Sequence, residues 1–366
     1  MLKKVGLSIL VFCFVVIVVF LFIIPSPIDP TAWNPPKQRI EEGPLQPNSL
    51  LERTQILTHD LIQPEDLLFD EEGRLYTGTK DGMINRLILN NQEIESLEVI
   101  AETGGYPLGL QFDSDGHLIA AVKEVGLVSI DPNNNNEITV LTNSVENQPI
   151  SYANELTILN EGIIYFTDSS TDYDAGWPYD LLEGKPHGRL LSYDPKTNET
   201  SIIIRKLHFA NGVVLSPDED YLLIAEMFRY RILRYWLKGP KAHTTEVFTE
   251  NLPLMPDNIS IDDEGDYWIA GNKRLPMIDG MQSKPFLKKQ IAKLPHGLLM
   301  KIPTQKSNRY GIVLRIGSTG EIKSSYHDPS GRVFSISTAL RKNDTIYLGT
   351  LMGDYIGRFD LGEESE

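Results

Sequence analysis

Two neighbouring stretches of the sequence decide the fold: HFANGVVLSPDEDYLLIAEMFRYRILRYWLKGP at 208–240 and PLMPDNISIDDEGDYWIAGN at 253–272. Each contains a polar residue, an apolar run, an acidic turn and a second run rich in aromatic and β-branched residues. Asn211 begins the first copy and Asp257 the second. Because two strand-like runs joined by a short acidic turn form a β-hairpin, the stretches predict the same hairpin twice.

The same pattern occurs six times along the chain. The residues in the opening position are Glu65, Leu108, Asn154, Asn211, Asp257 and Ser337, which lie 43, 46, 57, 46 and 80 residues apart. Repeats in the forties with about four strands each are typical of β-propeller blades. The sequence therefore predicts an all-β, six-bladed β-propeller over residues 51–366. We expect a strand from before Glu65 to close the ring on the sixth blade, since an open ring leaves sheet edges exposed.

The two longest gaps between repeats contain extra material. Residues 171–188 form a loop rich in Asp, Tyr, Gly and Pro, and residues 274–310 form a lysine-rich, partly helical insertion. Insertions in a repeat array usually lie on one face and often shape its binding face.

Composition limits the classes of protein to which the chain can belong. Of its 366 residues, 41% are hydrophobic and 9% aromatic, which suits a globular body with a sizeable core. The formal net charge of -16 argues against a nucleic-acid partner, because no basic patch offsets that field. The single cysteine, Cys13, lies in the N-terminal apolar segment, so the body contains no disulfide.

The N-terminal region carries a membrane signal. Val5–Ile24 contains no charge, follows two lysines, and at about 1.5 Å per residue is long enough to span a hydrocarbon core of roughly 30 Å. The lysines predict a cytoplasmic N-terminus and a body on the extracytoplasmic side, whether periplasmic, lumenal or extracellular. A cleaved signal peptide is the alternative, but its apolar region is usually shorter and ends at small residues. We expect residues 1–24 to be a cytoplasmic end and transmembrane anchor, and the proline-rich residues 25–50 to be a tether or a wrap over the body.

The repeats also align a set of oxygen-bearing side chains. In a propeller each opening residue precedes the innermost strand of its blade, so residues far apart in the sequence converge on one central channel. Four of the six positions carry a carboxylate or an amide: Glu65, Asn154, Asn211 and Asp257, with Asn258 beside the last. Any one of these residues alone is explained by its place at the start of a strand, because Asn and Asp tolerate turn geometry there and hydrogen-bond their own backbone. Four in equivalent positions predict a metal site, and an oxygen-only set without Cys or His matches Ca²⁺.

Several long strings of sequence resemble one family. They are FANGVVLSPDEDYLLIAEMFRYRILRYWLKGPKA, ENLPLMPDNISIDDEGDYWIAG, YANELTILNEGIIYFTDSSTDYD and IYLGTLMGDYIGRF. They resemble the strictosidine synthase-like branch of calcium-dependent propellers, and within it the adipocyte plasma membrane-associated proteins, which have a short cytoplasmic end, one anchor and a propeller. The wider superfamily includes paraoxonases and gluconolactonases. The resemblance covers roughly residues 25–362.

This resemblance implies a catalytic calcium ion and its ligands. By the resemblance, the ion is held by Glu65, Asn154, Asn211, Asp257 and Asn258. Two positions depart from the family patterns. Ser337 stands where strictosidine synthase has the glutamate that drives its amine–aldehyde condensation, which argues against that activity. Leu108 stands where paraoxonases have a histidine of the proposed base, so the resemblance supplies no general base.

The function that follows is calcium-dependent hydrolysis of a small-molecule ester or lactone, as in an arylesterase or lactonase. Calcium would bind the carbonyl oxygen and stabilise the oxyanion of the transition state. Water would need a base within about 3 Å, for which Asp168 and His208 are the candidates. Glu226 occupies a strand position equivalent to that of Asp168. Each has a structural alternative: a turn for Asp168, the lining of the mouth for His208, and an ion pair with a nearby arginine for Glu226.

A second class of function is compatible with the same residues. A non-catalytic propeller would bind a protein or lipid partner through its top face and the 274–310 insertion, with calcium in a purely structural role. The fold alone does not decide between the two classes.

Overall fold

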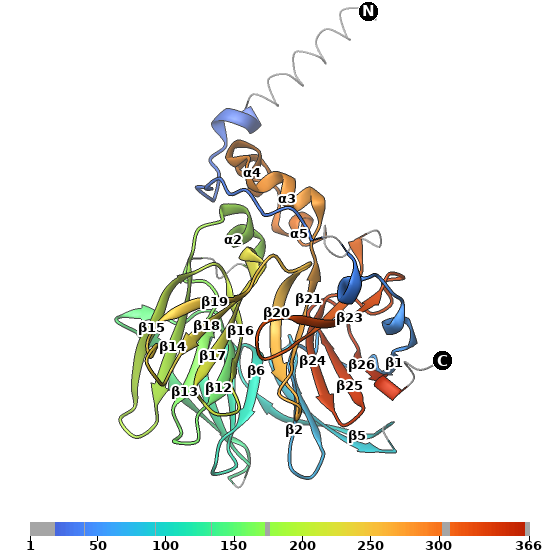
Figure 1. Cartoon of the computed structure of the whole chain (residues 1–366). Coiled ribbons are helices and arrows are strands. Elements are labelled where there is room, and N and C mark those ends of the chain that lie inside the picture. The colour runs from blue at the N-terminus through green and yellow to red at the C-terminus, as the bar shows by residue number, and fades with distance from the viewer. Residues whose placement is uncertain are drawn as a thin grey trace, which may run out of the picture.

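The computed structural model describes residues 19–39, 41–91, 93–132, 134–172, 176–301 and 308–362. These residues form six four-stranded antiparallel units, which Figure 1 shows side by side below a group of short helices. The first three units comprise β2 (Leu67–Phe69), β3 (Leu75–Gly78), β4 (Met83–Asn90) and β5 (Glu93–Glu102); β6 (Tyr106–Phe112), β7 (Leu118–Lys123), β8 (Gly126–Asp131) and β9 (Glu137–Thr142); and β12 (Ala153–Ile158), β13 (Ile164–Asp168), β14 (Gly188–Asp194) and β15 (Glu199–Leu207).

The other three units complete the ring. They comprise β16 (Ala210–Leu215), β17 (Tyr221–Glu226), β18 (Arg231–Trp236) and β19 (Thr245–Thr249); β20 (Leu254–Ile261), β21 (Tyr267–Lys273), β22 (Gly311–Ile316) and β23 (Ile322–Asp328); and β24 (Ile336–Lys342), β25 (Thr345–Thr350), β26 (Ile356–Asp360) and β1 (Gln55–Thr58). A two-stranded hairpin of β10 (Ser144–Val145) and β11 (Gln148–Pro149) lies between the second and third units. One antiparallel residue pair joins the last two units, with Gly271 of β21 opposite Ile336 of β24.

The six units are the blades of a propeller. The first strands β2, β6, β12, β16, β20 and β24 contact one another in cyclic order, with β24 returning to β2. Glycines allow this close approach: a Cβ added to Gly109 in β6 would lie 2.6 Å from the carbonyl oxygen of Asn154 in β12. Gly212 in β16 stands in the same relation to Asp257 in β20, again at 2.6 Å. The innermost strands are therefore packed too closely to admit a side chain at these two positions.

The N-terminal strand closes the ring. β1 pairs antiparallel with β26, with Gln55 opposite Arg358 and Ile56 opposite Gly357. This confirms the expected closure by a strand from before Glu65. It joins chain segments from opposite ends of the sequence, so the sixth blade cannot form until both are present.

The hydrophobic core lies between neighbouring blades. One cluster combines Leu223 and Ile232 of the fourth blade with Tyr267, Ile269 and Leu314 of the fifth, each fully or almost fully buried. Equivalent clusters occur between the other blades. Because each sheet is covered on both faces, the middle strands are buried along nearly their whole length, as in β7 and β25.

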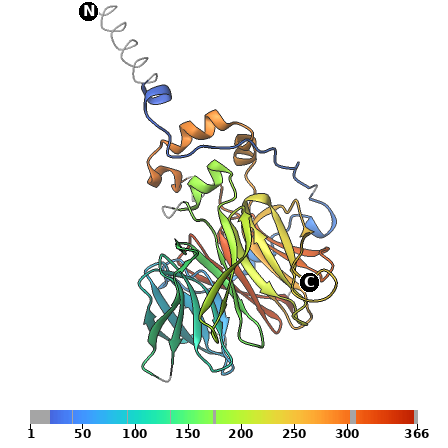
Figure 2. The ribbon, with the colours of Figure 1, turned by 90° about the vertical axis from the view of Figure 1, so that its left-hand side faces the viewer.

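A cap of helices covers one end of the propeller (Figures 1 and 2). It consists of α2 (Trp177–Glu183) from the first insertion and α3 (Pro276–Gln282), α4 (Pro285–Ala292) and α5 (His296–Leu299) from the second. Both insertions therefore lie on the same face, as expected. The short helices η2 (Gly43–Leu45), η3 (Leu50–Arg53) and η4 (Met227–Arg229) complete the helical elements between residues 41 and 301.

The chain that precedes β1 lies along the cap and the fifth blade. The backbone N–H of Thr31 donates to the carbonyl oxygen of Glu183 at 2.9 Å, and that of Trp33 donates to the carbonyl oxygen of Gln282 at 3.0 Å. Lys288 Nζ donates to the carbonyl oxygen of Thr31 at 2.7 Å. This segment is thus tied to both insertions.

The expected membrane segment, Val5–Ile24, lies largely outside the described residues. Its described end includes a short helix, η1 (Val19–Ile23). Among the residues that the structure describes, none of the helices is long and apolar enough to span a bilayer.

Candidate metal centre and its cavity

The axial residues lie at the cap end of the first strands. Glu65 lies two residues before β2, Asn154 and Asn211 lie in β12 and β16, and Asp257 and Asn258 lie in β20. All five are at most 3% exposed. Glu65, Asn154, Asn211 and Asp257 line one cavity, and the Nδ2 of Asn258 donates to Oε2 of Glu65 at 3.2 Å. The structure thus brings together all five residues that the sequence singled out.

β-Bulges explain how these side chains reach the axis. The pairing register shifts at the start of five of the first strands, for example between Pro256 and Ile259 in β20. A bulge places extra residues against the partner strand and re-aims their side chains. Asp257 and Asn258 are both within this shift, so two consecutive residues contribute to the centre although a regular strand would send them to opposite faces.

The centre contains buried oxygen atoms that lack hydrogen-bond donors among the described residues. They are Oδ1 of Asn154, Asn211 and Asn258, and Oδ2 of Asp257. The amide nitrogens, in contrast, are engaged: that of Asn211 donates to Asp257 Oδ1 at 2.5 Å, and that of Asn154 donates to Ser169 Oγ at 2.9 Å. An unsatisfied buried polar group costs about 1–3 kcal/mol, so four in one place call for a ligand. Carboxylate and amide oxygens of this kind fit a hard divalent cation.

The electrostatics of the centre also favour a bound cation. Burial raises the pKa of Asp257 from its usual 3.8 to about 8, although the hydrogen bond from Asn211 opposes the shift. Burial also raises the pKa of Glu65 well above its usual value, and the negative charges of Asp257 and Asp66 add to this. Both carboxyl groups therefore hold their protons more tightly than in water, and a bound cation would favour their ionised forms.

Two further acids in the channel were missed by the sequence reasoning. Asp66 and Glu155 directly follow the axial residues Glu65 and Asn154, and they are 7% and 6% exposed. Asp66 accepts hydrogen bonds from the backbone N–H of Leu110 at 3.0 Å and from Thr338 Oγ1 at 3.1 Å. Burial raises the pKa of Asp66 to about 7 and that of Glu155 well above its usual value. An acidic or amide residue next to an opening residue is the signal that could have found them.

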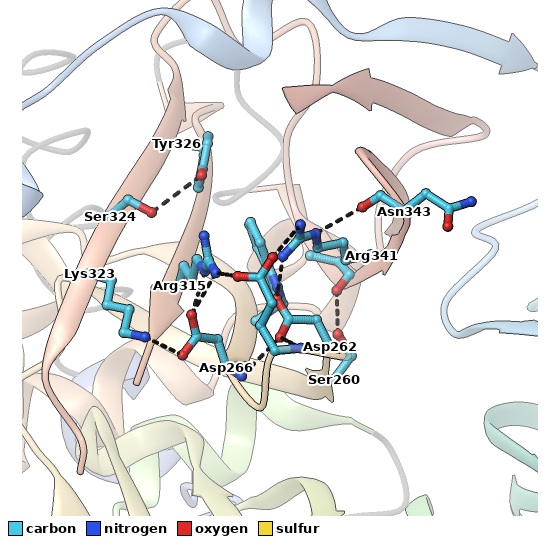
Figure 3. A network of polar contacts seen from close by, with 12 residues as sticks. Ser260, Asp262, Asp266, Arg315, Lys323, Ser324, Tyr326, Arg341 and Asn343 are labelled. Atoms are coloured by element: carbon cyan, nitrogen blue, oxygen red, sulfur yellow. Dashed lines mark hydrogen bonds and ion pairs between the residues drawn. The ribbon is translucent and has the colours of Figure 1, made fainter. Parts of the chain in front are cut away.

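A second acidic cluster lies in the turn between β20 and β21 (Figure 3). Ligand atoms of Asp262, Glu264 and Asp266 lie within 4.8 Å of one another. However, Arg341 pairs with Asp262 at 2.8 Å and with Glu264 at 2.9 Å, while Arg315 and Lys323 pair with Asp266 at 2.7 and 2.6 Å. These cations occupy the oxygens that a metal would need. We therefore assign the cluster to the stability of the fifth blade and not to metal binding.

Asp168, a candidate base, is engaged within the third blade. It is fully buried and does not line the cavity. Its Oδ2 accepts from Arg189 Nε at 2.8 Å, and its Oδ1 accepts from the backbone N–H of Tyr152 at 3.0 Å. Glu226 has the same arrangement in the fourth blade, with Arg231 Nε at 2.5 Å and the backbone N–H of His208 at 2.8 Å. This repeated clamp ties the three inner strands of a blade together, so we do not retain Asp168 as a base.

His208, the other candidate base, also lies outside the cavity lining. Its Nδ1 is buried and has no hydrogen-bond partner among the described residues. Burial, followed by the positive charges of Arg229 and Arg231, lowers the pKa of His208 to about 3. A neutral imidazole with so low a pKa accepts a proton poorly, and this position does not face the metal centre.

The cavity above the centre has a volume of about 530 Å³ and a largely apolar wall. Its floor is the axial set, and aromatic side chains of several blades, including Tyr152, Phe209 and Tyr310, form its sides. The cap contributes Trp177 of α2 and His296 of α5. His296 is the single imidazole among the described lining residues. The sequence reasoning did not single it out, because the insertion that carries it lies outside the repeat.

Comparison with known proteins identifies the family. The model for strictosidine synthase matches residues 154–240, and the model for the N-terminal region of strictosidine synthase-like proteins matches residues 43–87. The adipocyte plasma membrane-associated protein of Rattus norvegicus is 33% identical over 362 residues, which cover 93% of this chain and 95% of the relative. The chain belongs to the strictosidine synthase-like family of adipocyte plasma membrane-associated proteins. The expectation drawn from the quoted sequence strings is confirmed.

Solved structures support the propeller fold of this family member. A gluconolactonase from Xanthomonas campestris superposes with a TM-score of 0.61 at 14% identity, covering 92% of this chain and 96% of that chain. A calcium-binding protein, regucalcin, from Agrobacterium tumefaciens superposes with a TM-score of 0.56 at 13% identity, covering 84% and 92%. At such low identity the likeness concerns the fold.

Ser337 stands at the position where the sequence resemblance placed the glutamate of strictosidine synthase. Ser337 of β24 is fully buried, and its Oγ donates to the backbone carbonyl oxygen of Glu65 at 2.7 Å. The side chain therefore joins the sixth blade to the first and carries no carboxylate into the cavity.

Proposed function

We propose that this protein is a calcium-dependent hydrolase of esters or lactones. The observation that carries the proposal is the group of four buried oxygens without hydrogen-bond donors at the base of a largely apolar cavity. Glu65, Asn154, Asn211, Asp257 and Asn258 would hold the ion. When bound there, a calcium ion supplies positive charge that can stabilise the oxyanion of ester hydrolysis.

The protein's own residues would perform the other tasks. The aromatic walls would bind the apolar part of a substrate and exclude water from it. His296, which faces the cavity from α5, is the candidate proton acceptor in place of Asp168 and His208. Support for this chemistry comes from the gluconolactonase and the calcium-binding regucalcin that share the fold.

The test is hydrolysis by the full chain, kept in detergent, of phenyl acetate and a panel of lactones with calcium or with a chelator. We expect turnover that is lost on chelation and restored by calcium. Asn211→Ala and Asp257→Ala should abolish it, whereas Asn160→Ala, in an exposed turn after β12, should not. Thermal stabilisation by calcium without turnover of any ester or lactone would instead favour the non-catalytic propeller.

We also propose that the protein is anchored in a membrane by its N-terminal apolar segment, with the propeller on the extracytoplasmic side. Phe22 and Ile23, at the end of that segment, are 71% and 67% exposed, and Phe286 of α4 is 57% exposed. The rings of Phe22 and Phe286 lie 6.4 Å apart, so these exposed apolar side chains are adjacent. Such a patch suits contact with lipid. The names of the relatives refer to the plasma membrane.

We expect the protein to resist extraction by alkaline carbonate. We also expect an N-terminal tag to be protected from external protease, and the propeller to be cleaved by it. Release of the protein by carbonate would contradict the anchor.

A further inference from the structure

The cavity carries positive charge in a protein whose formal net charge is -16. Among the described lining residues, four are cationic, namely Lys80, Lys123, Lys273 and Arg309. Only two are carboxylates, and these are Glu65 and Asp257 of the candidate metal centre. The net charge of the cavity lining is therefore positive, whereas that of the whole chain is negative. It becomes more positive once a divalent cation compensates the two acids.

Three of these cations form a second ring above the axial one. Lys80 and Lys123 each stand fifteen positions after the opening residues Glu65 and Leu108, and Lys273 stands sixteen positions after the opening residue Asp257. They lie at or just after the ends of the second strands β3, β7 and β21. Because equivalent positions of a propeller lie at similar height around the axis, lysines from three different blades face the same space.

Two of the three lysines, Lys123 and Lys273, lie against aromatic rings of the cavity wall. Lys123 Nζ lies 4.7 Å from the centre of the Tyr152 ring, and Lys273 Nζ lies 4.0 Å from that of Tyr310. Their side chains are 17% and 26% exposed. A cation above an aromatic wall presents charge and a flat apolar surface together. This combination suits a ligand with a planar apolar part and an anionic group.

The acids of the metal centre do not account for these lysines. Within the described part of the chain, no ion pair joins Glu65 or Asp257 to a cavity cation. Lys123 and Lys273 pair with Glu124 at 3.6 Å and with Glu41 at 3.2 Å, and Glu124 is 60% exposed. An ion pair with a partner as exposed as Glu124 is weak, so much of the Lys123 charge stays available to a ligand.

We propose that the substrate of this cavity is an anion: an apolar, carboxylate-bearing ester or lactone whose carboxylate is held by Lys80, Lys123 and Lys273. The inference rests on the proposed hydrolase function and adds the substrate class. Hydrolysis adds water across the acyl C–O bond and gives an acid and an alcohol from an ester, or one hydroxy acid from a lactone, so the spectator carboxylate keeps its charge throughout. Its role is to bind and orient the substrate above the metal centre.

The experiment compares two substrates of the same shape, 4-acetoxybenzoate and the neutral 4-acetoxybenzamide, with the full chain in detergent and calcium. We expect kcat/KM to favour the anion and the preference to weaken with added salt. Lys80→Gln, Lys123→Gln and Lys273→Gln should each lower the ratio of the two kcat/KM values by about tenfold, the usual value of one hydrogen bond to a charged group. Lys80→Arg should retain it.

The matched control is Lys196→Gln, an exposed lysine in the turn between β14 and β15, far from the cap end of its blade. Its ratio should equal that of the unmodified protein. A ratio that stays within about twofold of this value in all three cavity variants would overturn the proposal, since one lost charge contact should exceed that change. So would an equal fall in the control.

A second measurement separates this proposal from the proposed function. Calorimetric titration with the product 4-hydroxybenzoate and with 4-hydroxybenzamide needs no turnover. Suppose that neither ester is hydrolysed, but 4-hydroxybenzoate binds more tightly than 4-hydroxybenzamide and Lys80→Gln removes that difference. The proposed hydrolase function is then wrong, and the proposed anion site is supported. If both esters are hydrolysed equally and both products bind with equal affinity, the proposed anion site is wrong and the proposed hydrolase function is supported.

Discussion

Asn211 donates its amide N–H to Asp257 Oδ1 at 2.5 Å across the boundary between the fourth and fifth blades, and each residue keeps one side-chain oxygen without a donor. One hydrogen bond thus fixes the orientation of two potential ligand atoms. Because the nitrogen faces the neighbouring carboxylate, the amide oxygen must face the channel. The same logic applies to Asn154, whose nitrogen is held by Ser169. The blades therefore aim the oxygens before any ion arrives.

Asp257→Asn should separate metal affinity from stability. The change removes one of two carboxylates at the centre, so calcium affinity should fall by at least about tenfold. It also removes a buried acid, so the metal-free protein should melt at a higher temperature at alkaline pH. Calorimetric titration with calcium and thermal melting in chelator test both effects. The exposed Asp115→Asn is the control, and unchanged calcium affinity in Asp257→Asn would place the ion elsewhere.

The stability of the metal-free protein should decrease as pH rises above about 6.5, where His208, whose lowered pKa has the opposite effect on stability, no longer titrates. The pKa of Asp257 is 3.8 in its usual state and about 8 in the fold, so between these values the native state keeps a proton that the unfolded state has lost. The free energy of unfolding therefore falls across this window, and Asp66, with a pKa of about 7, contributes with the same sign. The stabilisation by calcium should grow over the same range, because the ion binds the ionised acids.

Thermal melting from acid to alkaline pH, with chelator and with excess calcium, measures this dependence. Asp257→Asn should reduce the slope in chelator. Stability of the metal-free protein that rises with pH between about 6.5 and 8 would contradict the raised pKa values.

The fold and the axial residues could be predicted because both follow from the repeat. Hairpin patterns are local, and the symmetry of a propeller places equivalent positions such as Asn154 and Asn211 at the same height around one axis. Asp66 and Glu155 were missed because the hairpin pattern gives one axial residue per blade. It contains no sign of the β-bulge that sets the pairing of a first strand, as between Ala153 and Leu156.

The catalytic candidates could not be predicted for a different reason. Asp168 lies at the end of a second strand, close to the positions that hold cavity lysines in other blades. Its environment depends on Arg189 in the next strand, with which it pairs across the sheet. His296 belongs to an insertion, whose placement over the cavity is decided by packing against α2 and the N-terminal segment. Neither relation leaves a periodic signal in the sequence.

Gly212→Ala should weaken the metal centre through the backbone. Its Cβ would lie 2.6 Å from the carbonyl oxygen of Asp257, so β16 and β20 must move apart. Overpacking of this kind costs about 1–3 kcal/mol, and the displaced Asp257 should also lower calcium affinity. Gly280→Ala in α3 is the control, because nothing lies within 4 Å of its added Cβ. Denaturant unfolding and calcium titration measure the two effects, and wild-type values for both would refute the close packing.

Asp168→Asn should reduce stability and leave catalysis by the folded protein intact. The substitution leaves Arg189 buried, at 3% exposure, without its ionic partner, which typically costs about 3 kcal/mol or more. Denaturant unfolding should show this loss, while kcat/KM per folded molecule stays at the level of Asp115→Asn. A large fall in kcat/KM without loss of stability would restore Asp168 as a base.

His296→Gln tests the proton acceptor that replaces the two original candidates. The imidazole lines the cavity and its ring packs against Tyr179, with the ring centres 5.8 Å apart. Loss of a general base usually lowers turnover by about 10²–10⁴-fold, so kcat should fall by that range while the stabilisation by calcium is unchanged. His59→Gln, a surface histidine that is 67% exposed, should retain full activity. If His296→Gln is as active as this control, the water is activated by another group, and the acids of the floor become the residues to examine.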